Sequence, residues 1–348
     1  MLNIYSIEQT EQWDAVVRSF RDYDVYWLSG YVRAFQINGD GIPLLVYFEG
    51  GSTRGINVVM KRDIADVEYF VEKIDKNKYY DLSTPYGYGG WIIEGEDRKT
   101  LFSEYDKWLK KNRIVSEFVR FHPLLHNQEY CSGYYDVIRL GEVVHMDLSS
   151  PERIWENITS KNRNMIRKAM KNDVKIYNGR YPLIYDRFRE IYNLTMDKDG
   201  ADKYYYFPSE FYTSVLNDLS HNAQVFWAEK EGQIIAASII LAANGRLNYH
   251  LSGSIIEYNN LAPTNLLLYE VALWGSKNGF RTLYLGGGVG SENDSLFRFK
   301  RAFYKGDIEH FYIGKRIVDQ DSYEILSRIR GNIDSHFFPI YRAKITKS

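Results

Sequence analysis

The stretch from Arg281 to Tyr304 reads R-T-L-Y-L-G-G-G-V-G-S-E-N-D-S-L-F-R-F-K-R-A-F-Y. Its first residues predict a strand that ends in a glycine cluster, after which Asp294 or Ser295 caps a helix. Glycines at a strand end let the backbone approach a ligand closely and expose N–H groups. The pattern lacks the Gly-Lys-Ser/Thr of a Walker A loop, and Asn293 occupies the third glycine position of a dinucleotide fingerprint. A tight strand-to-helix turn without a ligand is the alternative interpretation.

The helix after the glycines places a lysine within its apolar face. At about 100° per residue, Lys300 falls inside the arc of aromatic and aliphatic side chains, whereas Arg298 and Arg301 lie on the opposite face. An ammonium group that faces a core costs several kcal/mol unless it is paired or open to a ligand. We therefore single out Lys300 as a candidate catalytic residue. Snorkelling or a structural ion pair is the alternative.

Strand-like and helix-like segments alternate over the rest of the chain, which predicts an α/β fold with a mixed sheet and flanking helices. Ser150 and Pro151 suit the N-cap and first position of a helix, so we place a domain boundary there and divide the chain into 1–149 and 150–348. The predicted helices are 97–111, 151–172, 181–197, 208–219, 263–278, 294–304 and 320–334. The predicted strands are 43–48, 55–60, 114–121, 174–177, 224–230, 233–242, 246–252, 281–285 and 308–314.

The composition excludes several classes of protein. The 348 residues suggest two domains, and 44 basic against 45 acidic residues leave a net charge of −1, so any basic site must be local. The single cysteine, Cys131, excludes a disulfide framework and a CxxC redox site. The N-terminus has no signal-peptide pattern and no apolar run reaches membrane-spanning length, so we expect a cytoplasmic protein that can still contact a membrane surface.

Three further features could contribute to a site. The predicted helix near 153–171 carries Arg163 and Arg167 on its basic side, which fits either a solvated face or an anion site for phosphate. His250, at a strand end, could accept a proton or be structural. The loop 84–90 is rich in glycine and tyrosine and could form a binding lip or a simple turn.

We expect no metal site. His122 and His126 have the i, i+4 spacing of a zinc pair, but Pro123 lies between them and no third ligand is evident.

An ordered set of motifs in the second half resembles the Fem family. These are the FemA/FemB/FemX-type aminoacyltransferases that build the interpeptide bridges of bacterial peptidoglycan. The resemblance covers roughly residues 150–315, and the first half matches only through the Tyr26-Trp27 region and the Pro85 loop. The motifs are Asn248-Tyr249-His250-Leu251-Ser252-Gly253-Ser254, Glu257-Tyr258, Pro263-Thr264-Asn265-Leu266-Leu267-Leu268-Tyr269-Glu270 with Trp274, Gly279, Leu285-Gly286-Gly287, and Leu296-Phe297-Arg298-Phe299-Lys300 with Phe303.

This resemblance implies two tandem domains of the Gcn5-related N-acetyltransferase (GNAT) fold, the last ~30 residues packing on the first domain. It implies an acyltransferase of EC class 2.3 that moves an aminoacyl group from aminoacyl-tRNA to an amine of a peptidoglycan-type precursor. No tightly bound cofactor is expected, and the oligomeric state stays open. Lys300 matches the lysine of the family's Phe-Lys motif.

The roles that we assign to residues combine this resemblance with the chemistry of amine acylation. Lys300 and the backbone N–H groups near the glycines could stabilise an oxyanion. The proton could go to His250, Glu292, Asp294 or the substrate itself. The expected donor or phosphate-binding residues are Arg163, Arg167, Asn265, Gly286, Gly287 and Gly288, and the expected acceptor-binding residues are Tyr26 and Tyr86.

The sequence also departs from the family pattern. It has no long charged coiled-coil arm, Tyr284 replaces the acidic residue that often precedes the family's Phe-Gly-Gly, and the glycine-rich pyrophosphate loop of coenzyme-A-dependent relatives is missing between 246–252 and 263–278. Two alternatives therefore stay open. One is an acyl-CoA-dependent N-acyltransferase that acts on an amino sugar or amino acid in surface polysaccharide assembly. The other is a non-catalytic binding module, which a fully closed core around Lys300 would favour.

Overall fold

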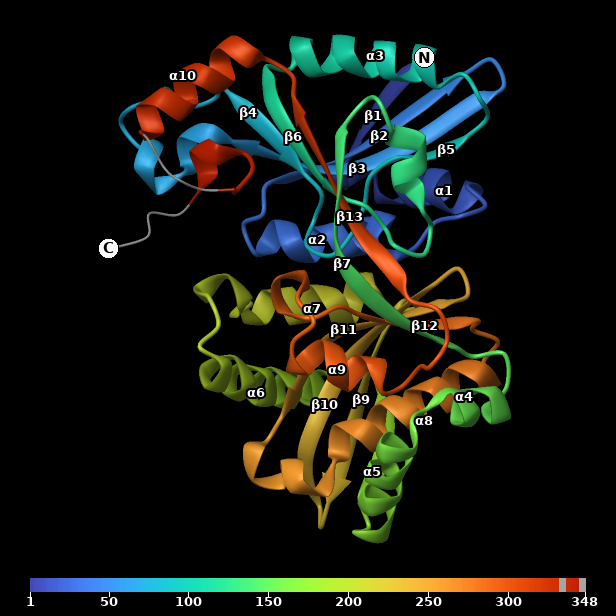
Figure 1. Cartoon of the computed structure of the whole chain (residues 1–348). Coiled ribbons are helices and arrows are strands. Elements are labelled where there is room, and N and C mark those ends of the chain that lie inside the picture. Colours follow the sequence, from blue (N-terminus) through green and yellow to red (C-terminus); the bar gives the residue numbers. More distant parts are fainter. Residues whose placement is uncertain (332–335, 344–348) are drawn as a thin grey trace. The chain divides into compact units, whose positions relative to one another are not determined.

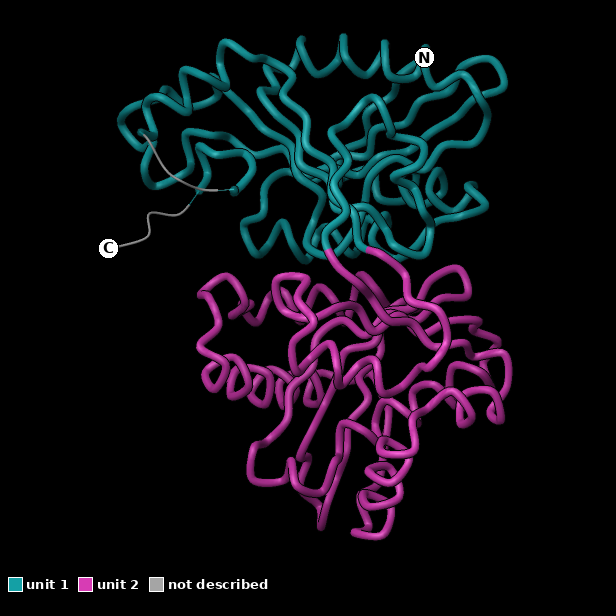
Figure 2. Tube along the Cα trace, in the orientation of Figure 1, with its two compact units in different colours: residues 1–140, 311–348 teal, residues 141–310 magenta. Residues whose placement is uncertain are grey.

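The computed structural model describes residues 1–331 and 336–343 (Figure 1). The chain forms two compact units (Figure 2): unit 1 comprises Met1–Leu140 with Phe311–Ser348, and unit 2 comprises Gly141–His310. The chain enters unit 2 within strand β7 (Asp136–Asp147) and returns to unit 1 within β13 (Glu309–Ile317). Each unit has its own set of strands and its own apolar core.

The strands of unit 1 are mostly antiparallel, and among its described strands only β4 and β6 run parallel to each other. Helix α3 (Arg98–Lys111) turns Leu101, Tyr105 and Leu109 into a core shared with apolar side chains of the sheet. The strand order is β1 (Leu2–Ser6), β2 (Ile42–Gly50), β3 (Thr53–Asp63), β4 (Tyr80–Ser83), β6 (Ile114–Arg120) and β13, with β5 (Ile92–Glu94) paired to β3. The other helices are α1 (Thr10–Ser19), α2 (Ser29–Ile37) and α10 (Gln320–Arg330).

The sheet of unit 2 is covered on both faces. Helices α5 and α8 share a buried core with Phe226, Ile240 and neighbouring side chains, while Gly253 on the opposite face lies against the backbone of α6. The two faces differ because successive side chains of a strand point to opposite sides of the sheet. The strand order is β7, β12 (Thr282–Gly286), β11 (Arg246–Ser254), β10 (Gln233–Ala243), β9 (Ala223–Lys230) and β8 (Lys175–Gly179). The helices are α4 (Pro151–Asn157), α5 (Ser160–Lys171), α6 (Pro182–Asp199), α7 (Ser209–Asp218), α8 (Pro263–Lys277) and α9 (Ser295–Arg301).

The structure departs from the predicted elements at several points, and β1, α1, α2, β4 and β5 were not predicted. The helix predicted over 151–172 is two helices, because Ile158 is extended and the Thr159 hydroxyl accepts a hydrogen bond from Asn162 N, which starts α5. Strand β7 was not predicted, and the change of unit lies within it rather than at residue 149. Helix α10 ends at Arg330, and residues 332–334 of the predicted helix lie outside the described residues.

Candidate functional site

Strands β11 and β12 separate at their carboxyl ends. They pair in parallel from Arg246 and Thr282 to Asn248 and Tyr284, and the described residues show no register pair beyond that point although both strands continue. Each strand also shifts register against its other neighbour at this level, as expected for β-bulges, which are frequent beside active sites. Ligands of open α/β sheets bind at the carboxyl ends of strands, so this opening is the candidate site.

Lys300 reaches this opening from helix α9. Its ammonium donates a hydrogen bond to the carbonyl oxygen of Gly287, 2.6 Å away and directly after β12. The side chain is 9% exposed, so the burial predicted from the helical wheel is confirmed. Within the described residues, no partner is found for the other two N–H donors of the ammonium. The lysine therefore ends at a polar turn rather than in a closed apolar core.

Burial lowers the pKa of Lys300 from 10.5 to about 8, and the charge of Asp294 opposes this shift. Asp294 serves mainly as the N-cap of α9: its carboxylate accepts hydrogen bonds from Phe297 N at 2.8 Å and Val289 N at 3.2 Å. These hydrogen bonds lower the pKa of the Asp294 carboxyl. At neutral pH the lysine is mostly an ammonium, which suits it to stabilise an oxyanion.

The three glycines at this turn have steric reasons to be glycine. Gly286 has φ +81°, and a Cβ there would lie 3.4 Å from Lys300 Nζ. At Gly287 a Cβ would approach the carbonyl oxygen of Glu142 to 2.8 Å, and at Gly288 it would overlap the carbonyl oxygen of Glu292. The cluster thus allows a tight turn that brings its backbone to Lys300, and donor binding by its N–H groups stays a prediction.

His250 lies on β11, two residues beyond the last pair with β12. It is the extra residue of the bulge, because Leu251 pairs with Ile239 and Tyr249 pairs with Ile240. The register therefore places His250 at the level of Gly286 on the diverging strand. Burial lowers the pKa of His250 to about 3, so its imidazole is neutral and only weakly basic at physiological pH.

The residues predicted to hold the donor form two groups on α5 and α8. The Arg163 and Arg167 guanidinium groups lie 5.8 and 5.1 Å from the ring centre of Trp155, a distance at which cation–π attraction holds them beside the indole. Asn265 donates a hydrogen bond of 2.7 Å to the side-chain oxygen of Asn162. Asn162 is buried, and its side-chain nitrogen has no hydrogen-bond partner within the described residues. The Asn162–Asn265 pair is therefore a polar contact between the first turns of α5 and α8.

The two predicted acceptor residues belong to an aromatic cluster in unit 1. Tyr26 is only 3% exposed, its ring packs edge-on to Tyr31 and Tyr88, and burial raises its pKa well above 10. The Tyr31 hydroxyl donates to the carbonyl oxygen of Tyr86 at 2.5 Å, and the ring of Tyr86 stacks on Phe35. The structure thus brings Tyr26 and Tyr86 together through Tyr31, with Tyr26 as a core residue and Tyr86 half-buried.

Sequence reasoning missed a polar cluster in unit 1. Asp81 is fully buried and is bound by Arg62 from β3 and by Arg342 from the segment after α10. Asp81 lies between Tyr80 and Leu82 in β4, and a carboxylate buried between such neighbours requires partners. Its partners could not be identified without the tertiary structure.

Comparison with known proteins supports the resemblance to the Fem family. An acetyltransferase (GNAT) domain model matches residues 160–301. The UDP-N-acetylmuramoylpentapeptide-lysine N(6)-alanyltransferase of Weissella viridescens is 26% identical over 169 residues, which cover 47% of this chain and 48% of that protein. The crystal structure of FemX superposes with a TM-score of 0.66 at 13% identity, covering 93% of this chain and 99% of the other.

Residues 160–301 therefore match a GNAT domain, and the chain has the fold of FemX over 93% of its length. The mixed α/β class and the tandem architecture predicted from the sequence are confirmed. The same fold occurs in the C-terminal domain of a putative lysylphosphatidylglycerol synthetase from Agrobacterium fabrum, with a TM-score of 0.56 and 15% identity over 89% of this chain and 91% of the other. At such identities the superpositions establish fold alone.

The sequence match spans about half the length of the curated alanyltransferase. The match to the GNAT domain model, over residues 160–301, includes α5, β11, α8, β12 and α9, on which the candidate site is built. Among the described residues, no helix is both long and apolar enough to cross a membrane.

Proposed function

We propose that this FemX-like protein transfers an aminoacyl group from aminoacyl-tRNA to an amine of a peptidoglycan-type precursor. The observation that carries the proposal is the position of Lys300 at the carboxyl end of β12. Its ammonium makes one hydrogen bond, to Gly287, within the part of the chain that the structure describes. The sequence similarity to an alanyltransferase supports alanine as the first amino acid to test and a UDP-linked muramoyl pentapeptide as the first acceptor.

The reaction forms one bond and breaks one. The neutral amine of the acceptor attacks the carbonyl carbon of the aminoacyl ester, and the tetrahedral intermediate carries a negative oxygen. The Lys300 ammonium stabilises that oxygen, because a charged donor in a largely buried site interacts strongly with developing charge. The C–O ester bond then breaks, and the amine proton passes to the departing ribose hydroxyl. With its pKa near 3, His250 is a weak base, so substrate groups carry this proton.

The segment between β11 and α8 favours aminoacyl-tRNA over acyl-CoA as the donor. It reads I-I-E-Y-N-N-L-A over residues 255–262 and contains no glycine and no basic residue. A pyrophosphate group at the start of a helix needs exposed backbone N–H groups or basic side chains. Glu257 instead adds negative charge there. The acyl-CoA-dependent enzyme is kept as the second candidate because the matching domain model is an acetyltransferase model.

The test is a transfer assay with the full chain. One reaction contains alanyl-tRNA with labelled alanine and UDP-linked muramoyl pentapeptide, and a parallel reaction contains labelled acetyl-CoA with the same acceptor. Mass spectrometry of the acceptor distinguishes an added alanyl group from an added acetyl group, and tRNA charged with other amino acids extends the donor series. A product only from acetyl-CoA refutes the proposed donor. No product from either donor with a folded protein refutes the assigned acceptor.

A further inference from the structure

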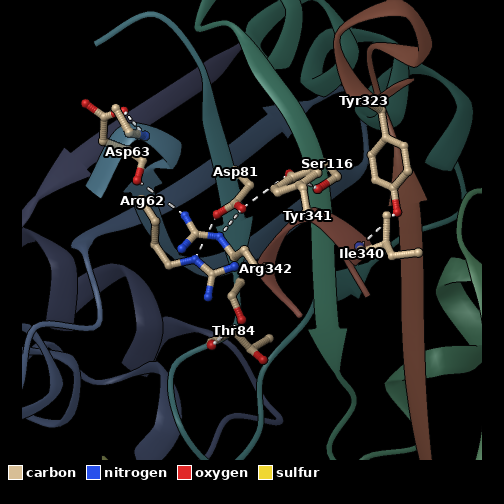
Figure 3. Close-up of polar contacts among 11 residues, drawn as sticks. Arg62, Asp63, Asp81, Thr84, Ser116, Tyr323, Ile340, Tyr341 and Arg342 are labelled. Carbon is tan, nitrogen blue, oxygen red and sulfur yellow. Dashed lines mark hydrogen bonds and ion pairs between the residues drawn. The ribbon is translucent and has the colours of Figure 1, made fainter. Parts of the chain in front are cut away.

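Unit 1 contains a buried carboxylate held by two arginines (Figure 3). Arg62 on β3 reaches Asp81 on β4 because the two residues are register partners, and its Nε lies 2.8 Å from Oδ1. Arg342, in the short helix after α10 (Ile340–Arg342), donates through Nε to Oδ2 of the same carboxylate. One buried negative charge therefore faces two positive charges.

The groups around this cluster are two neutral hydroxyls and the carboxylates of Asp63 and Asp66, each of which has hydrogen-bond or ion-pair partners of its own. The Tyr341 hydroxyl donates to Asp81 Oδ2 at 3.3 Å and lies 2.7 Å from Ser116 Oγ, and both hydroxyls are neutral. Arg342 also donates to the backbone carbonyl oxygen of Asp63 at 3.4 Å. The carboxylate of Asp63 itself accepts from the backbone amides of residues 65 and 77, at 3.0 and 2.7 Å. The nearby Asp66 is paired with a lysine, Lys76.

The two guanidinium groups keep donors available and remain partly accessible. The side chains of Arg62 and Arg342 are 26% and 15% exposed. Within the described residues, both terminal nitrogens of Arg62 and one of Arg342 have no hydrogen-bond partner. In Figure 3 the guanidinium groups lie between Asp81 and Thr84. Burial, with the adjacent charge of Arg342, lowers the pKa of Arg62, whereas for Arg342 burial is outweighed by the carboxylates of Asp81 and Asp66, which raise its pKa.

We propose that Arg62 and Arg342 form a binding subsite for an oxyanion, a phosphate or a carboxylate, and that Asp81 holds the two forks in position. Paired guanidinium groups match the geometry of both anions, and a bound anion would neutralise the surplus charge. Because β4 leads through Thr84 into the loop that carries Tyr86, the anion is placed to be part of the acceptor molecule. The subsite itself rests on this charge arrangement and not on the transfer reaction.

Direct binding to the full chain tests the subsite. The Nε–H resonances of Arg62 and Arg342 are followed by NMR in protein labelled at arginine and are assigned with Arg62→Gln and Arg342→Gln. Inorganic pyrophosphate and acetyl-D-alanine are titrated separately up to about 10 mM, which nearly saturates a site of millimolar Kd. We expect both resonances to shift with at least one probe. Arg62→Gln then weakens that binding about tenfold, since one charged fork is lost.

The control is Arg54→Gln, because Arg54 is paired one to one with Glu94 at 2.6 Å and leaves no surplus charge. We expect it to bind the probe like the wild type. Each single glutamine variant leaves one arginine on Asp81, so it should fold, and Arg62→Lys offers a milder second variant that keeps the charge but loses the fork.

A shift with pyrophosphate alone assigns the site to phosphate, and a shift with acetyl-D-alanine alone assigns it to a peptide carboxylate. Unmoved Arg62 and Arg342 resonances, or equal affinity in wild type and Arg62→Gln, would overturn the proposal. This readout does not require turnover, so failure of the transfer assay leaves it interpretable.

Discussion

Replacing Lys300 with methionine should make the protein more stable and much less active. The pKa of Lys300 falls from 10.5 to about 8. At about 1.4 kcal/mol per pKa unit, the buried ammonium costs ~3 kcal/mol of folding free energy. The variant also loses the hydrogen bond to Gly287, which costs it about 1 kcal/mol. The free energy of unfolding of Lys300→Met should therefore exceed that of the wild type by about 2 kcal/mol at pH 7. The loss of an oxyanion donor should lower kcat by about 10²–10³-fold.

The sign of the stability effect depends on pH in a defined way. A lysine whose folded pKa is depressed carries its full penalty below pH 8, where both folded and unfolded states are protonated. Between pH 8 and 10.5 the folded lysine deprotonates first, so the penalty declines and the advantage of Lys300→Met should vanish. Chemical denaturation at pH 7 and pH 10.5, with the transfer assay at pH 7, measures both effects.

The matched control is Lys305→Met, which changes an exposed lysine just after the same helix and should alter neither quantity. Full turnover by Lys300→Met would refute the catalytic role of the ammonium. A variant that is less stable than the wild type at pH 7 would refute the reasoning from burial, whatever its activity.

The remaining predictions concern the donor, the turn and the ion-pair network. If the Lys300 ammonium is needed, turnover should fall as pH rises through about 8. An active Lys300→Arg variant should keep its charge to higher pH, so the fall in its pH–rate profile should move to higher pH. A pH–rate profile that is the same for Lys300→Arg and the wild type would contradict this. The double variant Arg163→Gln with Arg167→Gln should raise the KM for alanyl-tRNA and leave kcat unchanged. The salt dependence of its kcat/KM should decrease by the amount that up to about two phosphate contacts contribute. The control Arg187→Gln, which removes an arginine paired with Glu190, should change neither. Gly288→Ala should destabilise the protein by about 1–3 kcal/mol in denaturant unfolding, because its Cβ would overlap the carbonyl oxygen of Glu292; unchanged stability would show that the turn can shift. Asp81→Asn should cost about 3–5 kcal/mol at pH 7, since it leaves Arg62 and Arg342 without a counter-charge. Burial raises the pKa of Asp81, but the two arginines outweigh burial and hold this pKa below 3.8. The stability that the Asp81 carboxylate contributes should therefore be lost as pH falls through and below that value. In acid the free energy of unfolding of the wild type should approach that of Asp81→Asn.

Local patterns in the sequence determined much of the candidate site. The period of the helix after the glycines placed Lys300 on a buried face, because side-chain direction in a helix follows from spacing alone. Alternating apolar residues around a glycine turn predicted the β2–β3 hairpin, whose register the structure confirms. The same reasoning read 151–172 as one helix, since it could not weigh the Thr159 cap against continued helical spacing.

The tertiary structure decided what depends on groups distant in sequence. The separation of β11 from β12 sets the opening at Gly286 and His250, and strand register is a property of two chain segments rather than one. The pairing of Asp81 with Arg62 and Arg342 joins residues up to 261 positions apart. A sequence shows which side chains need partners, because a charged residue within a segment that will be buried costs free energy wherever its partner comes from. Which partners they find depends on how the sheet brings distant strands and the C-terminal segment together.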